Sequence, residues 1–145
     1  MIRPVLGLAA CLIAVALTGC GHPSSAPHVD VAQAQAEAAK APKDAPHASF
    51  CATWSKLDAS AGADTDNATA FADFQDQLRS LERLGTPPGI PAEARHGFEV
   101  SVGAVLGGTW SEVSTGVKID GISTADRKAA VAFTTWAAKA CPAPK

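Results

Sequence analysis

The large aromatic side chains of this chain are confined to one part of it, which limits what can fold. All three tryptophans and all five phenylalanines lie at or beyond Phe50. Residues 21–49 contain four prolines, many alanines and no aliphatic side chain larger than valine. They offer too little apolar surface to offset the entropy of ordering. We therefore predict a folded domain over residues 50–141, after a flexible tether over 20–49 and before a tail over 142–145.

Four segments beyond the tether carry apolar residues at the spacing of an amphipathic helix. Their predicted bounds are 49–61, 66–84, 91–107 and 123–141. Ser123 and Asp126 resemble a capping box at the start of the last segment. Gly97 and Gly103 weaken the third segment by about 1 kcal/mol each, so either they allow close helix approach or the segment is less regular. Residues 108–122, interrupted by glycines, are predicted to form a loop.

The N-terminus has the pattern of a signal peptide. Residues 5–17 contain no polar side chain, follow Arg3 and end in small residues. This run of 13 residues is short of the roughly 20 that a spanning helix needs, and a charged start with a small-residue exit is typical of a cleaved signal. Residues 1–19 are therefore expected to be removed on export.

The end of that run resembles the bacterial lipobox, in the residues Leu17-Thr18-Gly19-Cys20. The resemblance implies cleavage before Cys20 and attachment of a diacylglycerol to its sulfur. Two or more acyl chains anchor a protein stably, whereas one chain binds reversibly. The expected location is the extracytoplasmic face of the cell membrane, with the lipid on Cys20 as the contact to the membrane.

The four cysteines each receive an assignment from this pattern. Cys11 leaves with the signal peptide and Cys20 takes the lipid, so Cys51 and Cys141 remain in an oxidising compartment, where such a pair normally closes. A metal or redox role for this pair is a weaker interpretation, because the chain has no CxxC motif. An antiparallel four-helix bundle would bring Cys51 and Cys141 to the same side, so we predict an all-α bundle closed by one disulfide.

Few residues of the sequence are candidates for metal binding, ligand contact or catalysis. His22, His28 and His47 lie in the predicted tether and are weak metal candidates, because they lack fixed spacing and an acidic or thiolate complement. Trp110 lies in the glycine-rich loop, where it is either a ligand contact or packing over the end of the bundle. His96 is expected on the water-facing side of its helix, paired with acidic neighbours.

Charge and motifs exclude several classes of function. The chain from Cys20 on carries 11 basic and 14 acidic residues, a net charge of −3, which argues against nucleic acid as a partner. Motifs for a nucleophile, for HExxH zinc binding or for a phosphate-binding loop are absent. The sequence implies no cofactor and no catalytic residue.

The whole arrangement resembles that of small secreted lipoproteins of actinobacteria, which join a lipobox, an Ala/Pro-rich tether and a disulfide-framed helical domain. The resemblance implies location and fold, and transfers no catalytic residue. We expect a non-enzymatic binding or interaction module for an envelope protein or small ligand. The alternatives are a metal or haem relay using the tether histidines, and an enzyme of unrecognised type.

Overall fold

The computed structural model describes residues 30–61, 68–109 and 122–142, and these residues form an all-helical bundle without strands. The helices are α1 (Val31–Ala38), α2 (His47–Ala61), α3 (Ala68–Leu84), α4 (Ala92–Gly107) and α6 (Thr124–Ala140). The prediction of an all-α fold is confirmed, but the described residues contain five helices where four were expected. Within this part of the chain, no helix is both long enough and apolar enough to cross a membrane.

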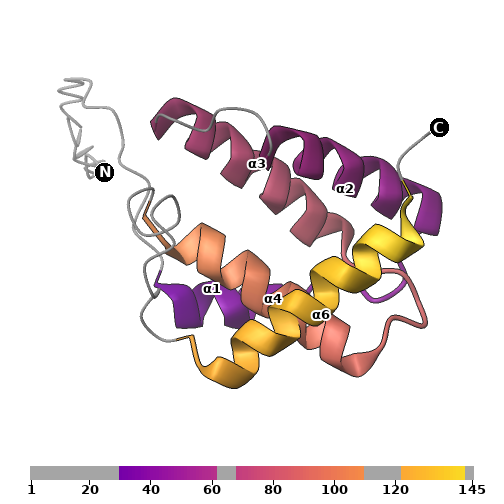
Figure 1. The fold of residues 1–145 in the computed structure, drawn as a ribbon. Coiled ribbons are helices and arrows are strands. Elements are labelled where there is room, and N and C mark those ends of the chain that lie inside the picture. The colour runs from indigo at the N-terminus through magenta and orange to yellow at the C-terminus, as the bar shows by residue number, and fades with distance from the viewer. Residues whose placement is uncertain (1–29, 62–67, 110–121, 143–145) are drawn as a thin grey trace, which may run out of the picture.

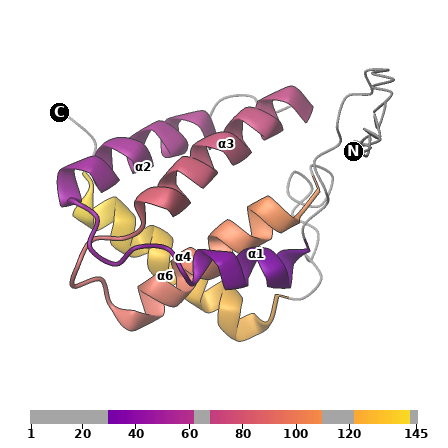
Figure 2. The ribbon, with the colours of Figure 1, turned by 180° about the vertical axis from the view of Figure 1, so that it is seen from behind.

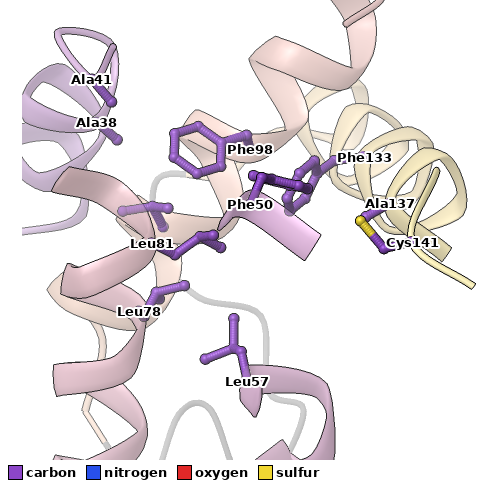
Figure 3. Close-up of a cluster of buried hydrophobic side chains, with 11 residues drawn as sticks. Ala38, Ala41, Phe50, Leu57, Leu78, Leu81, Phe98, Phe133, Ala137 and Cys141 are labelled. Atoms are coloured by element: carbon purple, nitrogen blue, oxygen red, sulfur yellow. The ribbon is translucent and has the colours of Figure 1, made fainter. Parts of the chain in front are cut away.

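The helices form two layers (Figures 1 and 2). Helices α2 and α3 lie side by side as one layer, while α1, α4 and α6 make the other. Within the second layer, α4 packs against both α6 and α1. Fully buried side chains from both layers meet in the core, including Phe50 of α2, Leu81 of α3 and Phe98 of α4 (Figure 3).

Local sequence explains where the helices start. The Ser123 hydroxyl accepts a hydrogen bond from the Asp126 backbone N–H at 3.1 Å, and the Asp126 carboxylate accepts one from the Ser123 N–H. This confirms the predicted capping box and satisfies two backbone donors that the first turn would leave free. Helix α4 begins directly after Pro91, whose fixed backbone angle suits a helix start.

The predicted disulfide is present. Cys51, one turn into α2, is bonded to Cys141 at the end of α6, and their Cα atoms lie 5.1 Å apart. The bond ties the α2–α3 layer to the α6 end of the other layer and closes a sequence separation of 90 residues. On the chain-entropy model, a loop of that length stabilises the fold by about 4–5 kcal/mol.

The predicted tether requires correction, because its second half belongs to the domain. Residues 31–38 form α1, and Ala34, Ala38, Ala41 and Ala45 are each at most 8% exposed. Glycines on the facing side of α4 allow this segment to approach the helix closely. A Cβ at Gly103 would lie 2.8 Å from the Gln35 nitrogen, closer than real Cβ atoms come. Gly103 has no side chain at the point where Gln35 of α1 contacts it, so the two helices approach closely there.

A buried arginine fixes the turn that follows α1. The Arg95 guanidinium of α4 donates to the carbonyl oxygens of Ala41 at 2.9 Å and Pro42 at 3.0 Å, and its Nε donates to Glu99 at 2.9 Å. It also donates to the Thr86 hydroxyl at 2.8 Å. Buried charge is tolerated only when it is fully hydrogen-bonded. Arg95 therefore needs the carbonyl acceptors of this segment, and the segment is held in place by the hydrogen bonds from Arg95.

Candidate functional site

The two layers leave an apolar cavity between them of about 930 Å³, open to the surface. Its walls come from α2, α3, α4 and α6, and the principal apolar residues are Trp54, Leu57, Phe74, Leu78, Val105 and Phe133. Ligand pockets typically measure about 300–1,000 Å³ and are lined mainly by apolar and aromatic groups. The cavity therefore has the size and the lining of a site for a small apolar ligand.

The cavity forms where the layers lie apart. Along α2, the fully buried Phe50 is followed one turn later by Trp54, which is only partly buried and lines the cavity. Along α4, the fully buried Phe98 is likewise followed by the partly buried Val105 two turns on. The cavity wall thus combines partly buried side chains with buried ones, such as Leu57 and Val102.

Aromatic contacts hold the wall of the cavity in place. Trp54 packs edge-on against Phe133 of α6, with ring centroids 5.3 Å apart, and Phe98 packs edge-on against the same ring at 5.6 Å. Such pairs add about 0.5–1.5 kcal/mol each beyond their buried area. Gln75 of α3 also donates from its side-chain amide to the Val105 carbonyl at 2.9 Å, which links α3 to α4 beside the cavity.

Polar groups of the cavity are neutral or negative. Its described lining includes the hydroxyls of Ser55, Thr134 and Thr135 and the carboxylate of Asp58. Asp58 is the only charged residue among the described lining residues. The arrangement offers hydrogen bonds to a polar head group and no cation to pair with an anionic one.

The predicted site residues have different outcomes. Cys20, His22, His28 and Trp110 lie outside the described residues. His47, predicted in the tether, is instead the first residue of α2, and its ring lies beside the disulfide.

Trp54 and Trp136 both pack against aromatic rings of the core. The cavity was not predicted from the sequence. The available signal was Ser101, a small polar residue at inward spacing between Phe98 and Val105, which leaves space that a larger apolar residue would fill.

His96 behaves as predicted for a surface histidine. Its ring is 54% exposed, lies 3.7 Å from the Glu99 carboxylate on the same helix and pairs with Asp126 of α6 at 2.8 Å. The Ser123 hydroxyl, followed by His96, holds the pKa of Asp126 below its ordinary value by hydrogen bonding to the carboxylate. These contacts support the α4–α6 pairing and lie apart from the cavity lining.

No family model, curated protein or solved structure matches this chain. The chemistry of the cavity is therefore the basis for assigning a function.

Proposed function

We propose that this protein is a lipid-anchored, extracytoplasmic binding module that holds a small amphiphile in the cavity between its two helical layers. The observation that carries the proposal is the cavity of about 930 Å³ with aromatic and aliphatic walls. Burying apolar ligand surface there would contribute about 25 cal/mol per Å² removed from water. Binding of this kind requires no reaction at the ligand, so it fits a non-enzymatic role.

The lining also favours one class of head group. Asp58 is exposed, so an anionic head group beside it would stay in contact with water and be repelled by a screened interaction of at most about 1 kcal/mol. The hydroxyls of Ser55 and Thr134 suit a neutral or cationic head group that donates hydrogen bonds. The proposed ligand is therefore an acyl-chain amphiphile with a hydroxyl or amine head group, of the kind found in envelope lipids.

The sequence supports the location part of the proposal. Removal of residues 1–19 and lipid attachment at Cys20 would place the domain beside a membrane that contains amphiphiles. The Cys51–Cys141 disulfide fits an oxidising compartment. Nine residues lie between Cys20 and Asp30, where the described structure begins, and these ten residue steps would hold the domain within about 35 Å of the lipid.

A comparison of three ligands with the same chain length tests the proposal. Dodecanol, dodecylamine and dodecanoate are titrated into the protein while tryptophan fluorescence is followed, since Trp54 lines the cavity. We expect the alcohol and amine to bind about fivefold more tightly than the carboxylate, a difference of about 1 kcal/mol. Equal binding of all three would contradict the head-group assignment, and binding of none would contradict the function.

A cavity-filling variant tests the location of the ligand. Val105→Trp places a large side chain inside the cavity and is expected to abolish binding while leaving helicity unchanged. Val131→Trp is the matched control, because Val131 is 64% exposed on α6 and lies outside the cavity lining. If both variants bind as the unaltered protein does, the ligand occupies another site.

A further inference from the structure

A histidine and the two disulfide sulfurs gather at one end of the molecule. His47 is the first residue of α2 and Cys51 follows one turn later, so both side chains lie on the same helix face. Cys141 reaches them from the end of α6. The Cys51 sulfur lies 3.8 Å from each ring nitrogen of His47, and one ligand atom from each of the three residues lies within 4.8 Å of the other two.

We infer that His47, Cys51 and Cys141 form a binding site for a thiophilic d10 cation, Zn²⁺ or Cu⁺, when the disulfide is reduced. Two thiolates and one imidazole are a preferred ligand set for such ions. Cys141 also belongs to the lining of the cavity, but the inference needs no amphiphile to be bound there.

The spacing of the ligand atoms fits a tetrahedral ion. Bonds of about 2.3 Å to sulfur and about 2.0 Å to nitrogen hold neighbouring ligand atoms about 3.5–3.8 Å apart. The imidazole nitrogens already lie 3.8 Å from the Cys51 sulfur. Once the S–S bond is open, rotation about the cysteine side-chain bonds brings the sulfurs to this separation, while the two helix ends stay in place.

One side of this site is buried in the protein and the other side is open to solvent. Cys141 is 7% exposed, and Cys51 is partly buried against the core. His47 is exposed at the surface, so an ion can enter from that direction. Three protein ligands leave a fourth position open to water or an exogenous ligand, as in zinc sites that are not purely structural.

The cation and the disulfide exclude each other, because they use the same two sulfur atoms. A dithiol reductant supplies two electrons and two protons, becomes a disulfide itself and leaves Cys51 and Cys141 as thiols. The cation then displaces both thiol protons, which pass to solvent, because a coordinating thiol is deprotonated outright. Either cross-link, covalent or metallic, joins α2 to the end of α6.

Titration of the full-length protein with Co²⁺ and Zn²⁺, before and after anaerobic reduction, tests the inference. Co²⁺ stands in for Zn²⁺ and reports thiolate ligation by a near-ultraviolet charge-transfer band and tetrahedral geometry by strong visible absorption. We expect the reduced protein to bind one equivalent with both signals, and the oxidised protein to show neither. His47→Ala should weaken binding at least tenfold, whereas His96→Ala, which removes an exposed histidine on α4, should leave it unchanged.

Every other result of the titrations supports or overturns the metal site. A reduced protein that binds no metal overturns the inference, as does His47→Ala binding as tightly as the unaltered protein. Circular dichroism covers the case in which reduction unfolds the chain. Helicity that returns on adding Zn²⁺ supports the site, because metal binding is then coupled to folding. Helicity that stays lost with Zn²⁺ overturns it.

Discussion

Arg95 is the residue on which the folding of the N-terminal segment most depends. Its guanidinium, in a side chain 8% exposed, holds the backbone carbonyls of Ala41 and Pro42 and the carboxylate of Glu99. Arg95→Met keeps much of the side-chain volume but leaves these acceptors without a donor. We expect a loss of about 3 kcal/mol in the free energy of unfolding, measured by urea denaturation.

Arg83→Met is the matched control for that substitution. Arg83 is exposed on α3 and donates to the Ser80 hydroxyl on its own helix, so its loss should change stability by no more than about 0.5 kcal/mol. If the two variants are equally stable, the hydrogen bonds of Arg95 do not hold the segment.

The lowered pKa of Asp126 leads to an expected change in the free energy of unfolding at acidic pH. Hydrogen bonds from the Ser123 hydroxyl and from His96 lower its pKa below the ordinary 3.8. A carboxyl with a lowered folded-state pKa stabilises the protein above its ordinary pKa, and that contribution is lost as pH falls below 3.8 towards the folded value. The stability advantage over Asp126→Asn should therefore shrink in that acidic range.

Carboxyl-carbon NMR titration measures the same effect directly. Ser123→Ala and His96→Ala should each raise the pKa of Asp126, and Ser123→Ala should raise it more, because the serine hydroxyl is the larger cause. The reverse order would show that the histidine, and so the α4–α6 contact, dominates.

At the scale of helices, close packing of α4 against α6 depends on Gly97. A Cβ at this position would lie 2.9 Å from the Cβ of Phe133 and would overlap the Ala129 carbonyl. Gly97→Ala gains about 1 kcal/mol of helix propensity, but overpacking against backbone costs more. We expect a net loss of about 2 kcal/mol by thermal unfolding.

Asp73→Ala on α3 is the control for the effect of helix propensity in Gly97→Ala, because it introduces alanine at a helix position without overpacking. Asp73 is exposed, so its replacement should be neutral or slightly stabilising. A Gly97→Ala protein at least as stable as this control would show that α6 can move aside at no cost.

The helices that the sequence predicted are those with large apolar residues at helical spacing. The prediction for α3, 66–84, agrees with the observed Ala68–Leu84 over the described residues, and residues 66 and 67 lie outside them. The agreement arises because Phe71 to Leu84 form a continuous apolar stripe. Helix α1 was missed for a physical reason. Its buried residues are alanines, and its close approach to α4 depends on Gly103 and Gly107, which contact Gln35 and Val31 from more than sixty residues away.

The cavity also could not be predicted from the sequence. Its apolar lining residues, such as Phe74 and Val105, have the same helical spacing as core residues. Only the separation of the two layers distinguishes a packed interface from a binding site, and that separation depends on tertiary packing. The disulfide was predictable because Cys51 and Cys141 were the two cysteines left once the sequence pattern had assigned Cys11 and Cys20.

At the scale of the whole molecule, the boundary of the folded domain is the most consequential correction. Residues 30–45 cover α4 with α1 and supply the carbonyls that Arg95 binds. Ala38 and Ala41 also belong to the central core cluster (Figure 3). The segment is thus part of the domain in the same sense as α6, although its composition resembles that of a linker.

Two truncated chains distinguish a tether from a domain element. A chain starting at Asp30 keeps α1 and should unfold at the same temperature as the full-length protein. A chain starting at Pro46 exposes the α4 surface around Gly103 and removes the backbone carbonyls that the Arg95 guanidinium binds. Loss of these contacts should cost at least about 4 kcal/mol, a large share of the 5–15 kcal/mol typical of a domain. Equal melting temperatures for the two chains, followed by circular dichroism, would restore the tether interpretation for residues 30–45, because a true tether can be removed without affecting the fold it carries.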